Sequence, residues 1–190
     1  MKKILLLVFV FVNYFSFAGS IIEPISTGNW SEPTNGLRGR LVFSEDSKFY
    51  GTEMGVIYLE LQNISGVGNP MEIYFDTMHS QLHFQLTDIN NNPIKDSPSP
   101  LDQMTPDSYW INLPHDSTLR FRVSWNGYGI PKDTGLAIGV PEHFWIIPAN
   151  STNNYFLSAS FDVSPPNNKD HIHAWKGGLV LPNVKIPADR

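Results

Sequence analysis

The chain has 190 residues, no cysteine and a formal net charge of −5, a length that suits one well-buried core better than two small ones. Because basic residues are not clustered along this acidic sequence, neither nucleic acid nor an anionic membrane is expected as a partner. Without disulfides, packing alone must hold the fold together.

The N-terminus has the features of a secretory signal peptide. Two lysines precede the uncharged run Ile4–Val12, and Ser16 and Ala18 supply small side chains at positions −3 and −1 of a cleavage site. We therefore predict a signal peptide over residues 1–18 and a polar N-terminal arm over residues 19–35. The apolar run is too short for a comfortable membrane span. We expect the mature chain to be secreted or periplasmic, without a membrane span, and the Met-Lys-Lys start favours a bacterial host.

Beyond the arm, apolar and polar residues alternate with period two, which is typical of half-buried strands. No stretch repeats apolar residues at helical spacing over three turns. In chain order, the predicted strands cover residues 37–43, 57–62, 71–76, 82–87, 109–113, 119–125, 143–147, 155–163 and 179–186.

The segments between these strands are rich in turn-forming residues. Combinations of Gly, Pro and Asn occur at residues 66–70, 90–93, 126–127 and 165–168. The Pro-rich segment 96–107 is expected to form a surface loop, where a partner could bind. Many short strands separated by turns indicate an antiparallel sandwich or barrel. We predict an all-β fold, namely an antiparallel Ig-like β-sandwich of about eight to ten strands, in a single domain over residues 36–190.

Two segments carry a resemblance to exported bacterial proteins. Residues Leu59–Asn63, a second apolar strand, Phe84–Asp88 and an Asn-rich turn follow one another between Val56 and Pro93. This order resembles the Ig-like domains of bacterial exported proteins and is similar to the BsuPI-type proteinase-inhibitor domain, although the turn has Asn where those domains have Gly. The segment Trp175–Pro182 resembles the closing strand of uncharacterised secreted bacterial proteins. The resemblance implies a fold and transfers no inhibitory loop.

Metal binding is the first chemistry to consider. His171 and His173 are two residues apart, so on a strand they would face the same way, and Asp170 is adjacent. Two imidazoles with a carboxylate are suited to zinc or copper. The alternative interpretation is that these histidines are structural or solvent-exposed. The chain also has histidines at His79, His83, His115 and His143.

Other catalytic or metal-binding patterns are missing from the sequence. There is no Gly-x-Ser-x-Gly and no His-Glu-x-x-His. Asp88–Asn92 begins like a calcium loop, but Pro93 and Ser99 stand where an EF-hand needs Gly and Glu, so we expect a hairpin turn. We predict no catalytic residues and no cofactor.

A surface patch is the second candidate site. On their predicted strands, Tyr58, Glu60 and Gln62 share one face, and Glu72, Tyr74 and Asp76 share another. If the two strands pair, aromatic and polar side chains form a patch suited to a sugar, with Tyr58, Glu60, Glu72 and Tyr74 as ligand-binding candidates. If the strands lie in different sheets, the patch does not form. The alternative is a solvated face whose acids pair with Arg38, Arg40, Arg120 or Arg122.

The tryptophans divide between core and surface. Trp125 shares the inward face of its strand with Phe121 and is expected in the core. Trp110, Trp145 and Trp175 lie in or beside short strands, so their side chains could equally lie in the core. Trp30 lies in the polar arm and is expected to be the most exposed.

Together, these patterns favour an exported, non-catalytic binding or structural module. Its partner would be a protein or a cell-surface polysaccharide outside the cytoplasm. The alternative is an extracellular hydrolase or metal-dependent enzyme on the same scaffold. Convergence of His79, His83, His171 and His173, or of two carboxylates in a cleft, would favour the enzyme. A flat face with its acids in salt bridges would favour binding or a structural role.

Overall fold

The computed structural model describes residues 24–46, 54–68, 70–76, 81–98, 108–125, 135–166 and 170–187. The predicted signal peptide, His79 and most of the Pro-rich segment 96–107 lie outside the described residues. Within them the chain is all-β, with essentially no helix. The predicted fold class is therefore confirmed at this level.

Twelve strands lie in the described residues, and every strand predicted from alternation is among them. Their bounds are β1 (Ser26–Thr27), β2 (Leu37–Asp46), β3 (Met54–Asn63), β4 (Met71–Phe75), β5 (Leu82–Thr87), β6 (Ser97–Pro98), β7 (Tyr109–Leu113), β8 (Thr118–Arg122), β9 (Leu136–Val140), β10 (His143–Ile147), β11 (Tyr155–Val163) and β12 (Gly177–Ile186). The number exceeds the predicted eight to ten because β1, β6 and β9 were not predicted. The first two have only two residues each, and β9 is buried along its whole length and so does not alternate.

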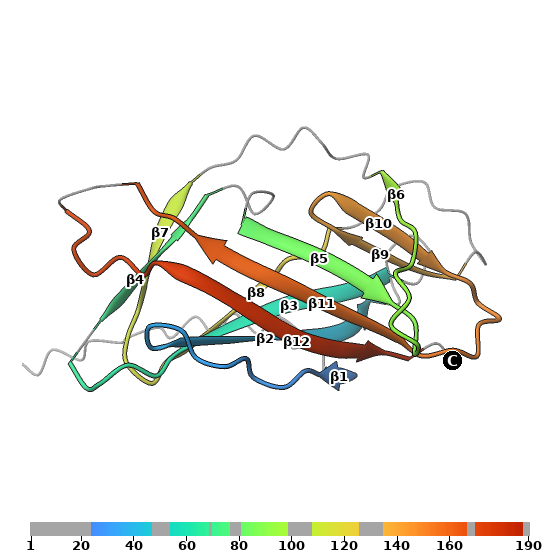
Figure 1. Cartoon of the computed structure of the whole chain (residues 1–190), viewed down its shortest axis with the longest axis horizontal. Coiled ribbons are helices and arrows are strands. Elements are labelled where there is room, and N and C mark those ends of the chain that lie inside the picture. Colours follow the sequence, from blue (N-terminus) through green and yellow to red (C-terminus); the bar gives the residue numbers. More distant parts are fainter. Residues whose placement is uncertain are drawn as a thin grey trace, which may run out of the picture.

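The strands form three sheets (Figure 1). The largest has seven strands in the order β1-β2-β3-β9-β10-β6, with β8 also paired to β3. A three-stranded sheet has the order β12-β11-β5, and β4 and β7 form a separate two-stranded ribbon. All pairs are antiparallel except β3–β9, which is parallel and joins only two residues of each strand. In Figure 1 the three-stranded sheet lies across the front of β2, β3 and β8, with the ribbon at the left end.

The two larger sheets face each other across one hydrophobic core. Alternate residues of β2 and β3 point inward from the large sheet, and alternate residues of β5 and β11 point toward them. Gly39 on β2 packs directly against Leu181 of β12. A methyl group placed on this glycine would lie only 2.7 Å from Cδ2 of Leu181. The ring of Phe75, from the ribbon, contacts both Phe121 and Phe161 and so covers the end of the core.

The described part of the N-terminal arm runs along β2. Residues of β1 pair with Val42 and Phe43, and the amide of Gly28 donates to the carbonyl of Leu41. Ser31 then forms two bonds with Gly39: its amide donates to the Gly39 carbonyl, and its hydroxyl accepts from the Gly39 amide. These bonds satisfy the edge of β2 and place Trp30 beside the outer face of the large sheet.

The Asn-rich turn after β5 is held by one carboxylate. Asp88 Oδ1 accepts hydrogen bonds from the amides of Asn90 and Asn92, and Oδ2 accepts one from the Asn92 side chain. Asn91 adopts a left-handed conformation with φ of 62°, which asparagine tolerates better than most residues. The turn predicted in place of a calcium loop is confirmed. The hydrogen bond from the Asn92 side chain, followed by those from the backbone, lowers the pKa of Asp88.

Replacing Phe161 tests the assignment of inward and outward faces on β11. Phe161 is fully buried between Phe75 and Trp175, whereas Phe156 on the same strand points outward and is only half-buried. We expect Phe161→Ala to lower the free energy of unfolding by about 3–5 kcal/mol and Phe156→Ala by less than half of that. Urea denaturation measures both, with Phe161→Leu as a milder variant. Equal losses at the two positions would contradict the assigned register.

The Asp88 turn predicts a pH-dependent difference between the wild type and Asp88→Ala. Because folding lowers the pKa of Asp88 below its ordinary value of 3.8, the stabilisation is complete above that value and is lost as the pH falls through the folded pKa. The wild type should therefore be more stable than Asp88→Ala near neutral pH, and the difference should shrink in acid. Urea denaturation at neutral and acidic pH measures this. A difference that does not change with pH would contradict the role of the ionised carboxylate.

Candidate functional site

The outer face of β2, β3 and β8 carries the candidate site. The register places Glu60 of β3 opposite Arg40 on one side and opposite Arg120 on the other. In the neighbouring rows, Gln62 is opposite Arg38, and Tyr58 is opposite Arg122. With Trp30 from the arm, these side chains form a surface that we call the arginine face, defined as Trp30, Arg38, Arg40, Tyr58, Glu60, Gln62, Arg120 and Arg122.

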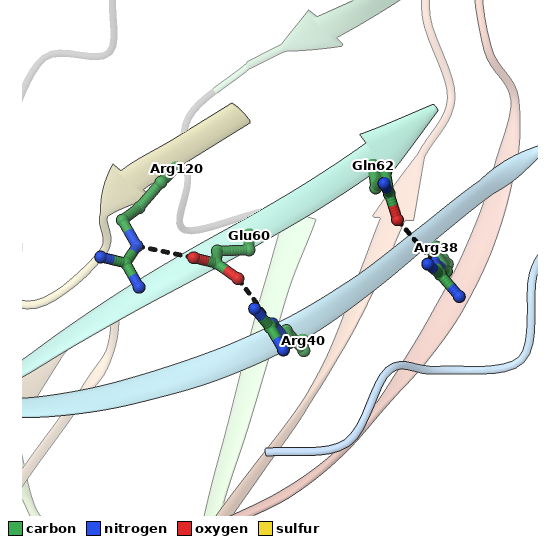
Figure 2. A network of polar contacts seen from close by, with 5 residues as sticks. All are labelled: Arg38, Arg40, Glu60, Gln62 and Arg120. Carbon is green, nitrogen blue, oxygen red and sulfur yellow. Dashed lines mark hydrogen bonds and ion pairs between the residues drawn. The ribbon is translucent and has the colours of Figure 1, made fainter. Parts of the chain in front are cut away.

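Glu60 lies at the centre of this surface and is held by two arginines (Figure 2). Its Oε2 accepts a hydrogen bond from Arg40 Nε at 2.5 Å, and its Oε1 accepts one from Arg120 Nε at 2.7 Å. The Glu60 side chain is only 8% exposed, while those of Arg40 and Arg120 are 27% and 33% exposed. A carboxylate with so little access to water needs such charge-assisted bonds. Glu60 therefore acts as a counter-ion that fixes two guanidinium groups.

Arg38 and two aromatic rings extend the site on either side. Arg38 Nε donates to the amide oxygen of Gln62 at 2.8 Å. The guanidinium carbons of Arg38 and Arg40 lie 4.7 and 4.3 Å from the centre of the Trp30 ring, and Arg120 lies over Tyr58 at 5.4 Å. These distances fit cation–π contacts, which further restrict the arginines. Trp30 is half-buried rather than freely exposed, because the arm folds back onto β2.

The arginine face is positively charged on an acidic chain. Three neighbouring strand segments, residues 38–42, 58–62 and 118–122, carry four arginines and one glutamate at their outward positions. The whole chain has a formal charge of −5. The sequence contains no basic cluster because these arginines come from distant strands and meet only in the folded sheet. The pairing of Glu60 with Arg40 and Arg120, predicted as the alternative to a joint patch, is confirmed.

A second group of polar and aromatic side chains lies on the β4–β7 ribbon. The His171 ring stacks on Trp110, with 3.7 Å between ring centres and 8° between planes, and Tyr74 contacts the same Trp110 at 4.9 Å. His171 Nδ1 is 3.4 Å from Glu72 Oε2, and both atoms are buried without a hydrogen-bond partner. Trp110 was not predicted as a site residue, since only the pairing of β4 with β7 places it opposite Tyr74.

The structure separates the four predicted ligand-binding residues into two pairs. Tyr58 and Glu60 lie in the seven-stranded sheet, whereas Glu72 and Tyr74 lie in the ribbon, so the joint patch that would require β3 to pair with β4 is not formed. Glu72 instead lies beside His171, one of the two predicted metal ligands, and Tyr74 contacts Trp110, on which the His171 ring stacks.

His171 and His173 do not lie on a strand as the metal hypothesis assumed. Residues 171–173 form a turn, in which His171 packs against Trp110 and His173 is exposed. The carbonyl of His173 accepts a hydrogen bond from the amide of Glu72. Among the described residues, no group of three or more His, Cys, Asp or Glu side chains is arranged to hold a metal ion.

A groove of about 370 Å³ lies beside this turn. It is lined by Asn35, Ser65, Pro70, Met71, Ile172, His173, Ala174, Trp175 and Lys176. Trp175 is almost fully buried, and its indole nitrogen donates to the carbonyl of Thr34, while the side-chain amide of Asn35 donates to the carbonyl of Lys176. These two hydrogen bonds tie residues 34–35 to residues 175–176 beside the groove.

Comparisons with known proteins give no family for this chain. No protein-family model, curated protein or solved structure matches it. Within the described residues, no helix has the length and apolar character needed to cross a membrane. Function must therefore be argued from the geometry of the chain itself.

Replacing Glu60 tests whether its charge holds the arginine face together. Glu60→Gln keeps the shape but places an amide donor against an arginine Nε and removes the charge. Because both arginines are partly exposed, we expect a loss of about 1–3 kcal/mol in the free energy of unfolding, measured by urea denaturation.

Gln62→Ala on the same strand is the matched control, since it removes a hydrogen bond from an arginine to an uncharged, partly exposed amide and should cost about 1 kcal/mol. Salt separates the two effects. The deficit of Glu60→Gln should shrink at high ionic strength, because salt screens the ion pairs that the wild type retains. A Glu60→Gln variant as stable as the wild type would contradict the assigned role.

Proposed function

We propose that this chain is an exported, non-catalytic binding module whose ligand is a polysaccharide outside the cytoplasm. The arginine face is its proposed binding surface. Export is supported by residues 1–18, whose basic start, apolar run and small-residue cleavage site fit a secretory signal peptide. On this proposal the mature protein acts in the periplasm or in the medium.

We also propose that the scaffold is an Ig-like β-sandwich. Two mainly antiparallel sheets that face each other across one core support this assignment. The resemblance of Val56–Pro93 to the domains of exported bacterial proteins is a second, independent support. In such folds, the outer faces of the sheets are free to bind a ligand while the inner faces carry the core.

The single observation that carries the binding proposal is the composition of the arginine face. Polysaccharides are commonly bound by aromatic rings together with amide and charged groups that reach their hydroxyls. Tyr58 and Trp30 supply the rings, Gln62 the amide and the arginines the charged donors. All except Trp30 are on paired strands, and Glu60 fixes two of the guanidiniums before a ligand arrives. Such preorganisation lowers the entropic cost of binding.

The state of Glu60 favours binding over catalysis at this surface. A general acid or base must reach the proton that it transfers. Both oxygens of Glu60 are engaged by arginine Nε atoms, and the side chain is almost inaccessible. Among the outward residues of segments 38–42, 58–62 and 118–122, Glu60 is the one carboxylate. The surface therefore offers donors and aromatic rings, but no carboxylate that is placed to transfer a proton.

Affinity electrophoresis of the mature protein through gels containing a panel of neutral and acidic polysaccharides tests this proposal. We expect at least one polysaccharide to retard the protein. We expect Tyr58→Ala to weaken that binding about fivefold to tenfold, because the variant loses one aromatic contact.

Gln85→Ala is the matched control, since Gln85 is exposed on the outer face of the three-stranded sheet. Its retardation should equal that of the wild type. The proposal fails if no polysaccharide in the panel retards the protein. It also fails if Tyr58→Ala and Gln85→Ala bind equally well.

A further inference from the structure

We infer that the ligand of the arginine face is an acidic polysaccharide whose carboxylates are bound by the guanidinium groups of Arg38, Arg40 and Arg120. This inference rests on the proposed function and names the chemical class of its ligand. It follows from the charge of the face, from the N–H groups that its arginines leave unused and from the spacing of those arginines.

The charge of the face attracts an anion to this part of the surface. At the outward positions of residues 38–42, 58–62 and 118–122, Glu60 is the one carboxylate among four arginines. The chain as a whole is acidic, so a polyanion is repelled by most of the protein. A positive surface on such a background concentrates and orients an acidic ligand at one place.

The arginines also have N–H groups left for a ligand. A guanidinium has five N–H donors, and the hydrogen bonds of Arg38, Arg40 and Arg120 described above all use Nε. The two terminal nitrogens of each group are not donors in these bonds. Terminal nitrogens suit a carboxylate particularly well, because two parallel N–H groups match its two oxygens. Glu60 and Gln62 therefore orient the arginines without using those nitrogens.

The arginines come from two different strands, an arrangement that suits a polymer with several carboxylates. Arg40 and Arg120 flank β3, so their backbones are two strand spacings apart, or about 10 Å. Arg38 and Arg40 are two residues apart on β2, or about 7 Å. The arginines are thus spread over both neighbours of β3, and a chain of acidic sugars, which presents carboxylates at regular intervals, can meet them in succession. Gln62 and Tyr58 lie among the arginines and are placed to contact the sugar rings between the charges.

A pair of polysaccharides with the same backbone tests the inference. Polygalacturonate carries a carboxylate on each sugar, and its fully methyl-esterified form is neutral. We expect the mature protein to bind polygalacturonate at least about tenfold more tightly than the ester, by isothermal titration calorimetry. Each arginine–carboxylate contact is a charge-assisted bond that the ester cannot form. Affinity should also fall as salt is added.

Variants then locate the binding. Arg38→Gln leaves the Glu60 ion pairs intact and should weaken binding of polygalacturonate about fivefold or more, with a smaller salt dependence. Arg120→Lys keeps the charge but loses the paired N–H groups, and it should also weaken binding. Lys185→Gln on β12 removes one positive charge elsewhere and should bind as the wild type does.

The outcomes separate this inference from the proposed function. Equal affinity for polygalacturonate and its neutral ester would overturn the inference and leave a polysaccharide-binding module. Equal affinity for dextran sulfate of matched charge density would overturn the role of carboxylates, and equal effects of Arg38→Gln and Lys185→Gln would overturn the assigned surface. Failure to bind any polysaccharide would overturn the proposed function and the inference together.

Discussion

The register of β3 is the constraint on which both faces of the large sheet depend. β3 pairs with β2 along all ten of its residues, and with β8 and β9 on its other side. A shift of one residue would move Leu59 and Leu61 to the outside and Glu60 into the core. The burial of the leucines therefore also decides where the charged residues lie. The hydrophobic core and the arginine face are two results of one strand register.

Glu60 makes this register more specific. A carboxylate at 8% exposure is tolerated because the residues opposite it on both neighbouring strands are arginines. In another pairing, Glu60 would lose one or both partners and remain a desolvated charge. A hydrophobic residue at the same position would pack against almost any neighbour, and so would not discriminate between registers. The ion pairs thus support one arrangement of β2, β3 and β8 over its alternatives.

Alternation predicted the longer strands, but not which strands are neighbours. The predicted segments all form strands, because most of them alternate apolar and polar residues, which leaves a period of two in the sequence. β9 was missed because Leu136–Val140 is buried on both faces, which removes the period. Glu72 and Tyr74 were placed on the correct face of β4, yet their partners come from β7 and from the turn at His171. Pairing between distant strands is set by packing over the whole core, which local patterns do not contain.

The same limit explains why composition does not show where charge gathers on the folded chain. Charge counted along the chain gives an acidic protein without basic clusters, and on this ground neither nucleic acid nor an anionic membrane is expected as a partner. The sheet brings Arg38 and Arg40 next to Arg120 and Arg122, about eighty positions further on, and adds only Glu60 between them. A ligand responds to this local field rather than to the net charge, since salt screens charges more than about 10 Å away. The net charge of the chain therefore does not describe the outer face of β2, β3 and β8, where the strand register gathers the arginines.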